Sequence, residues 1–82
     1  MYITNTALDA DKSISINITD NVNNNRPSNE YIPIIIPYTK VQNFILISFG
    51  NADGTLYVTC KNIYTGNLKF EVRAYIIWIK TA

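Results

Sequence analysis

The sequence predicts an all-β fold, a small antiparallel β-sandwich or jelly-roll, from three observations. Several stretches alternate apolar and polar residues with the period of two that a half-buried strand requires. Turn-forming segments rich in Asp, Asn, Gly and Pro separate these stretches, and no stretch predicts a convincing helix. The chain has 82 residues, which suffices for one domain with one core. We expect residues 1–12 to be a lead-in segment and residues 13–82 to form the sandwich.

The first two strands are expected at residues 13–19 and 31–38. The segment SISINIT (13–19) places three isoleucines on one face and polar residues on the other. Residues 20–30 are polar and turn-rich, which indicates an exposed loop. The segment YIPIIIPY (31–38) is apolar on both faces but contains two prolines. Because proline cannot donate to a strand ladder, this segment is either an edge strand or two short pieces joined by a bend.

Two further strands are expected at residues 41–49 and 55–64. The segment VQNFILISF (41–49) is rich in β-branched and aromatic residues, which favours a buried strand. In residues 55–64, the alternation points Leu56, Val58 and Cys60 inward. The pair Asp53-Gly54 can supply the positive φ of a hairpin between these strands.

The last strand is expected at residues 68–80, and Gly66-Asn67 is expected to join it to the preceding strand by a second hairpin. The last three strands would then form an antiparallel meander. Along this final strand the pattern changes. Charged residues alternate with apolar ones in its first half, whereas both faces are apolar in its second half, where Tyr75, Ile77 and Ile79 continue the charged face.

Two explanations fit this change of pattern. Either Tyr75, Ile77 and Ile79 form an oligomer interface, with Ile76 and Trp78 in the protomer core, or residues 31–38 cover the three side chains within one protomer. The interface is favoured, because so short a chain has little else to cover that face.

Composition excludes several functions. Only 16% of the residues are charged and the net charge is +1, so no basic patch is available for nucleic acid. The chain has no histidine, which removes the commonest catalytic base and a common metal ligand. The single cysteine, Cys60, excludes an internal disulfide. We therefore expect no enzyme, no cofactor and no metal site.

No signal peptide or membrane-spanning run is visible. We therefore expect a product made in the cytoplasm without membrane insertion. Surface binding remains, because tyrosine rings can stack on sugars while asparagine side chains bond to their hydroxyls. Tyrosines on the sheet face, such as Tyr31 and Tyr57, are expected to cover the sheet. The candidate ligand-binding residues lie near strand ends and in loops, where most are turn formers first: Tyr38, Asn51, Asp53, Asn62, Tyr64 and Asn67.

Three segments in this order, KSISINIT, YIPIIIPYTKVQNFILISFGN and TLYVTCKNIYTGNLKFEVRAYIIWIK, resemble a known family. It is the extreme C-terminal head or tip domain of tail-fibre or receptor-binding proteins in phages and prophages of Gram-positive bacteria. The family's pattern is a spaced Val and Asn, followed by a closing apolar strand that ends in Lys. In this chain the positions are filled by Val58, Asn62 and the run Phe70 to Lys80. The resemblance covers the chain from about Lys12 onward. Such domains usually end a long fibre, whereas this chain starts with its own Met1. The alternatives are a fragment, an internally initiated product and a free-standing tail or capsid component.

The resemblance implies a homotrimer in a virion or phage-tail-like particle, whose outer surface binds host cell-wall polysaccharide or teichoic acid. The alternative is a purely structural module that drives trimerisation, assembly or decoration of the particle and binds no ligand. Loss of adsorption without loss of assembly would indicate the first, and loss of assembly on charging Ile77 or Ile79 would indicate the second.

Overall fold

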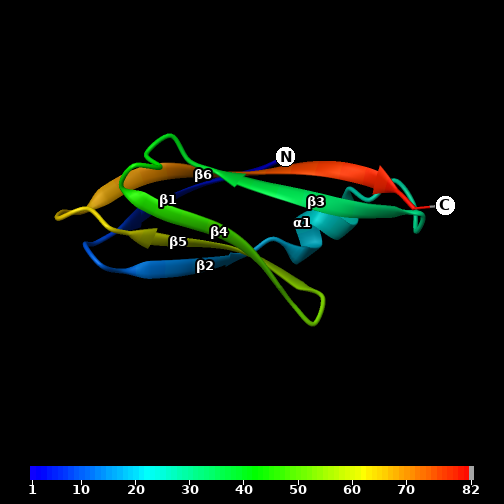
Figure 1. Cartoon of the computed structure of the whole chain (residues 1–82), viewed down its shortest axis with the longest axis horizontal. Helices are drawn as coiled ribbons and strands as arrows, with labels where there is room; N and C mark the ends of the chain where they lie inside the picture. The colour runs from blue at the N-terminus through cyan, green and yellow to red at the C-terminus, as the bar shows by residue number, and fades with distance from the viewer. Residues whose placement is uncertain (82) are drawn as a thin grey trace.

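The computed structural model describes residues 1–81 and shows two three-stranded antiparallel sheets with one short helix (Figure 1). The all-β prediction is confirmed. The elements in chain order are β1 (Tyr2–Leu8), β2 (Ser13–Asn17), α1 (Thr19–Asn24), β3 (Tyr31–Tyr38), β4 (Ile45–Ala52), β5 (Thr55–Asn62) and β6 (Leu68–Lys80). No helix in residues 1–81 is long and apolar enough to cross a membrane.

The two sheets form two layers with the long strands at their centres. Sheet A has the strand order β1-β6-β3, and sheet B has the order β2-β5-β4. Of the two alternatives for YIPIIIPY, the edge strand is confirmed, because β3 is one continuous strand at an edge of sheet A. The connection from β5 to β6 carries the chain from one layer to the other (Figure 1).

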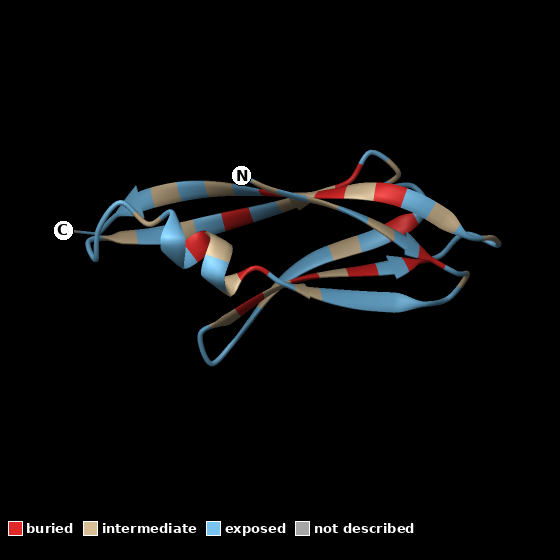
Figure 2. Ribbon diagram, turned by 180° about the vertical axis from the view of Figure 1, so that it is seen from behind, coloured by how far each residue is buried: buried red, intermediate tan, exposed pale blue. Residues whose placement is uncertain are grey.

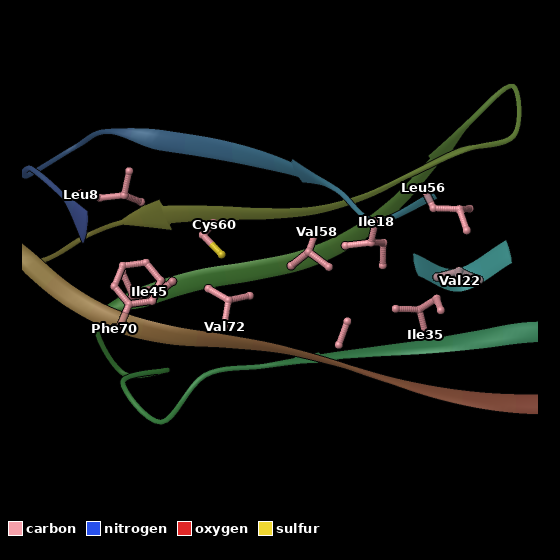
Figure 3. Close-up of a cluster of buried hydrophobic side chains, with 11 residues drawn as sticks. Leu8, Ile18, Val22, Ile35, Ile45, Leu56, Val58, Cys60, Phe70 and Val72 are labelled. Carbon is pink, nitrogen blue, oxygen red and sulfur yellow. The ribbon is translucent and has the colours of Figure 1, made fainter. Parts of the chain in front are cut away.

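The core lies between the layers, where alternate residues of both sheets meet. In Figure 3, Ile45, Val58 and Cys60 of sheet B point toward Phe70 and Val72 of sheet A. The helix closes one end of this core, where Val22 lies between Leu56 and Ile35. The expected inward face of β5 and the buried state of Cys60 are confirmed.

The expected lead-in segment is instead a strand of sheet A. Residues Tyr2–Leu8 pair with β6 in a register that runs from Tyr2 opposite Ala74 to Leu8 opposite Leu68. The inward positions between these ends are Thr4 and Thr6, both partly buried. Because threonines occupy these inward positions, the stretch has little of the apolar alternation that marks a strand.

The segment expected to be a loop, residues 20–30, contains most of α1. The side-chain oxygen of Asn17 accepts a hydrogen bond from the Thr19 backbone N–H at 3.0 Å, just before the helix. Val22 is completely buried and is the apolar residue that anchors α1 on the core. A single buried side chain on a six-residue helix is too short a signal for a periodicity argument.

The strand expected at 41–49 begins later, at Ile45, and residues 41–44 form a turn. The Phe44 N–H donates to the Val41 carbonyl at 2.8 Å, which closes this turn. The expected burial is wrong for most of this stretch, because only Ile45 is buried while Leu46 and Phe49 are exposed. The apolar character of the stretch does not distinguish a strand from the turn that leads into it.

The expected meander is half right. Asp53 and Gly54 have positive φ values of 50° and 84° and join β4 to β5 as a hairpin. The second hairpin is wrong, because β6 pairs with β1 and β3 in the other sheet, and neither Gly66 nor Asn67 has a positive φ. The inward apolar side chains of β6 pack against those of β5 across the core, which requires the two strands to lie in different layers.

One end of sheet A continues past β1 as a two-stranded ribbon that lies beside α1 (Figure 1). Strand β1 begins with Tyr2 opposite Ala74 and pairs with β6 only from there toward Leu68, whereas β3 lies beside β6 as far as Lys80. We call the paired residues Tyr31–Ile36 and Tyr75–Lys80 the β3–β6 ribbon.

Candidate interaction surface on the β3–β6 ribbon

The outer side of the β3–β6 ribbon carries six large apolar side chains in three directly opposite pairs. The pairs are Ile36 with Tyr75, Ile34 with Ile77, and Ile32 with Ile79. Their relative exposures lie between 37% and 47%. Figure 2 shows exposed positions alternating with partly buried ones along this end of sheet A. We call these six side chains the apolar face.

The other side of the ribbon is covered by the chain itself. Ile76 and Trp78 pack against the core, and the guanidinium carbon of Arg26 lies 5.4 Å from the centroid of the Trp78 ring. Arg26 also donates a hydrogen bond to the Tyr31 carbonyl. The ribbon therefore has one side packed on α1 and the following loop, and one side bare.

The explanation that residues 31–38 cover Tyr75, Ile77 and Ile79 is wrong. These residues form β3, which lies beside β6 in the same sheet and leaves the three side chains partly exposed. The pairing even adds three isoleucines to the exposed face. The expectation that Ile76 and Trp78 contribute to the protomer core agrees with their packing.

Ion pairs lie near both ends of the apolar face. Arg73 bonds to Glu71 at one end, and Lys80 lies 3.8 Å from Glu30 at the other. Hydrogen bonds from Arg73 to the Tyr75 hydroxyl and to Glu71, together with the charge of Glu71, raise the pKa of the Arg73 guanidinium above its ordinary value. A bare apolar centre with a polar rim is the arrangement found in protein–protein interfaces.

The outer face of sheet B provides a comparison within the same molecule. It carries mainly polar side chains, and Ser15 and Thr59 hydrogen-bond across neighbouring strands at 3.1 Å. Leu46, 59% exposed, is a large aliphatic side chain on this face and lies opposite Lys61. A sheet face in contact with water normally has this polar character, so the apolar face on sheet A is a departure that requires an explanation.

The six candidate ligand-binding residues do not form one site. Asn51 and Asp53 belong to the β4–β5 hairpin, at the opposite end of β5 from Asn62. The Asn51 side-chain oxygen accepts a hydrogen bond from the Gly54 N–H at 3.1 Å, and Asp53 adopts the positive φ of the turn. Both residues therefore have a structural role in the hairpin.

Asn62 is completely buried and forms three side-chain hydrogen bonds. Its amide donates to the carbonyls of Leu8 at 2.8 Å and Gly66 at 2.9 Å, and its oxygen accepts from the Tyr64 N–H at 2.7 Å. These bonds tie the end of β1 to the connection between β5 and β6. The side chain has no surface to offer a ligand.

The remaining three candidates lie on the surface. The Tyr64 ring contacts Phe44 edge-on, with centroids 4.9 Å apart, and both residues are exposed. The Asn67 amide donates to Asp9 at 2.9 Å across the same end of the molecule. Tyr38 is half-buried on the outer side of sheet A, with its ring centroid 6.4 Å from that of Tyr75, so it adjoins the apolar face.

Two depressions lie away from all six candidates. One of about 610 Å³ follows β1 and β6 and is lined by Asn5, Thr6, Ala7, Lys69, Phe70 and Glu71. The other, of about 260 Å³, lies between β1 and β2. Within residues 1–81, no group of three or more potential metal ligands gathers. Burial raises the pKa of the Cys60 thiol to about 11, which keeps it protonated at neutral pH.

Sequence reasoning missed half of the apolar face, namely Ile32, Ile34 and Ile36. A signal was present, because these isoleucines alternate with Tyr31, Pro33 and Ile35 at strand spacing. An edge strand beside β6 places every second residue on the side of the sheet that carries Tyr75, Ile77 and Ile79. The apolar character on both faces of YIPIIIPY is compatible with a bare edge strand, but only the pairing with β6 shows which of its residues share the exposed side.

Comparisons with known proteins give no relative for this chain: no protein-family model matches it, and searches of curated proteins and of solved structures give no significant match.

Proposed function

We propose that this chain is a structural module that assembles with copies of itself through the apolar face, as part of a virion or phage-tail-like particle. The observation that carries the proposal is the set of three opposite apolar pairs on the outer side of the β3–β6 ribbon. The sequence resemblance to tail-fibre tip domains supplies the particle. The resemblance implies a homotrimer, and the proposal itself requires only that copies of the chain associate.

A second copy of the chain is the partner that this surface fits best. The six side chains carry no charge, so a charged partner would find nothing to pair with. The face is also regular, because it is formed by two strands paired in register. Two such faces bury each other's apolar side chains without leaving a charge unpaired.

The free energy gained by burying the apolar face is too small to hold two copies together by this contact alone. Fully burying a large aliphatic side chain contributes about 1.5–3 kcal/mol, so covering half-exposed faces on two copies contributes on the order of 10 kcal/mol. Association costs on the order of 4–15 kcal/mol in lost freedom. A two-stranded ribbon with six residues in each strand also measures only about 20 by 10 Å. The apolar face alone therefore supports a weak contact, and stable assembly requires neighbouring contacts as well.

Charging the apolar face is expected to reduce assembly. Ile77→Asp places a carboxylate at the centre of the face, and burying it against a second copy would leave it without a partner. The measurement is absolute mass by light scattering on a sizing column, together with a circular dichroism spectrum that confirms folding. We expect a shift to lower mass, or to precipitation if assembly supports folding.

Leu46→Asp is the matched control, because Leu46 is at least as exposed but lies on the polar face of sheet B. This variant should keep the wild-type mass. Equal masses for wild type and both variants, all folded, would contradict the use of the apolar face in assembly.

Recognition of host cell-surface glycan is a second candidate, favoured by the surface at the opposite end of the molecule. There the exposed Tyr64 lies on the same connection as Asn67, which bonds to Asp9, and the Tyr64 ring contacts the exposed Phe44 of the β3–β4 connection. An exposed aromatic ring beside an amide and a carboxylate can stack on a sugar and bond to its hydroxyls.

Tyr64→Ala tests this candidate, because Tyr64 is exposed and its loss should leave assembly unchanged. We expect at least a tenfold weaker retention on purified cell-wall polysaccharide in affinity electrophoresis, with the mass unaltered. Tyr57→Ala, on the outer face of sheet B, is the control and should bind as wild type does. Equal retention of wild type and Tyr64→Ala would rule out this site.

A further inference from the structure

The β3–β6 ribbon has a free backbone edge on β6. Strand β1 occupies this edge only as far as Ala74. In the part of the chain that the structure describes, no strand pairs with this side of residues Tyr75–Lys80. A row of unpaired backbone groups of this kind is a template for pairing with another strand.

The direction of the backbone groups along this edge follows from the register. Thr81 is one step beyond the pair of Lys80 with Tyr31, and its N–H donates to the Glu30 carbonyl at 2.7 Å. Because backbone groups of successive residues point to alternate sides of a strand, the odd-numbered residues of this half of β6 face β3. The N–H and C=O groups of Ile76, Trp78 and Lys80 therefore face the free edge.

The prolines of β3 give the same assignment independently. Pro33 lies opposite Trp78 and Pro37 lies opposite Ala74. A proline within a sheet occupies a position whose nitrogen points away from the ladder. The residues opposite the prolines accordingly direct their own backbone groups away from β3, toward β1 at Ala74 and toward the free edge at Trp78.

The other edge of the ribbon, on β3, is closed to pairing. Pro33 and Pro37 have no N–H to offer there. The Tyr31 N–H donates to the Ser28 carbonyl at 3.2 Å, and the Tyr31 carbonyl accepts from Arg26. Prolines and covering loops are devices that keep a sheet edge from pairing. The β3 edge carries prolines and a covering loop, whereas the β6 edge has neither and has a charged residue only at its end, Lys80.

We propose that the β6 edge pairs antiparallel with the same edge of a second copy, across a twofold axis at Trp78. This deepens the assembly proposed above and rests on it. The edge is self-complementary, because each copy presents alternating N–H and C=O groups from Ile76, Trp78 and Lys80. With the axis at Trp78, Trp78 pairs with its own copy and Ile76 pairs with Lys80 of the other copy, so all six edge residues of the two copies are paired.

Neighbouring registers satisfy this edge less well. An axis at Ile77 pairs Ile76 with Trp78 but sets Lys80 opposite Ala74, which already pairs with Tyr2 of β1. An axis midway between Ile77 and Trp78 sets outward residues opposite inward ones, which a sheet does not allow. The register at Trp78 is therefore the one that uses the whole edge.

Pairing in this register joins two apolar faces into one. The four strands β3, β6, β6 and β3 form a continuous sheet, whose outer side carries the six apolar side chains of each copy. This edge pairing supplies the additional contact that the apolar face needs for stable assembly. Because the pairing has a twofold axis, it predicts an even number of copies, whereas the family resemblance implies three copies.

Disulfide crosslinking tests the register. In the proposed pair, Ile77 lies opposite Ile79 of the other copy at a non-hydrogen-bonded position, where Cα atoms are about 4.5 Å apart, within reach of a disulfide. The variant Ile77→Cys/Ile79→Cys should form dimers with mild oxidant, detected by non-reducing electrophoresis. The native Cys60 is buried and should not compete.

Ile32→Cys/Ile34→Cys is the matched control, with equally exposed residues at the same spacing on β3. In the proposed sheet the two copies of β3 are three strand spacings apart, about 14 Å. We expect at least tenfold faster crosslinking for the pair on β6. Equal rates for the two variants, or a faster rate for the pair on β3, would overturn the edge pairing.

Amide hydrogen exchange of the wild-type protein gives a test that needs no substitution. The amides of Ile76, Trp78 and Lys80 should be protected to the same degree as those of Ile77 and Ile79 in the assembled protein. Fast exchange at the three edge amides in protein of oligomeric mass would refute the edge pairing and leave assembly through the apolar face standing. Monomeric mass would refute both.

Discussion

Ile45→Ala is expected to lower the free energy of unfolding by about 2–5 kcal/mol, the range for removing a buried aliphatic side chain. Ile45 is 1% exposed and points across the core toward Phe70 (Figure 3). A domain of 82 residues has a total stability of about 4–12 kcal/mol at roughly 0.05–0.15 kcal/mol per residue. This one substitution therefore removes a large part of the stability, as urea unfolding followed by circular dichroism would measure.

Leu46→Ala is the control for this prediction, because it changes the next residue of the same strand on the exposed side. We expect a change within about 0.5 kcal/mol, which is usual for surface positions. Similar losses for the two variants would mean that the inward and outward sides of β4 are wrongly assigned.

Asn62→Ala is expected to cost about 3 kcal/mol, because it leaves one buried and two part-buried backbone groups without this partner. The side chain satisfies the carbonyls of Leu8 and Gly66 and the N–H of Tyr64. Each buried group left unsatisfied costs about 1–3 kcal/mol. The loss should also loosen the passage from β5 to β6, which would appear as faster amide exchange at residues 63–67 than in wild type.

Asn67→Ala is the matched comparison, because the Asn67 amide donates one exposed hydrogen bond, to Asp9. Its expected cost is below about 1 kcal/mol, within the net range of a single hydrogen bond. A loss at Asn62 no larger than the loss at Asn67 would show that Asn62 does not hold this connection.

Much of the fold could be predicted because the apolar alternation of single strands is a local signal. The inward residues of β5 and of the first half of β6 were recognisable from period two alone. Local patterns do not say which strands pair. The path from β5 to the opposite layer depends on the core between them and on the buried Asn62, and neither has a signature within a few residues of sequence.

The candidate site was recognisable only in part for the same reason. Tyr75, Ile77 and Ile79 stood out because their apolar character breaks the charged pattern that precedes them. Their partners on β3 could not be identified without the register, because every residue from Ile34 to Ile36 is an isoleucine and both faces of that strand look alike. Loop asparagines were ambiguous as well, since turn formation and ligand binding use the same side-chain chemistry.

The apolar face and the free edge of β6 lie on the same ribbon, and we propose that other copies of the chain cover both. The most direct test is the mass of the wild-type protein in analytical ultracentrifugation over a range of concentrations. The account predicts a multiple of the 9.3 kDa protomer mass that falls on dilution. A constant protomer mass up to the highest concentration would contradict it, and the exposed isoleucines would then have no role in assembly.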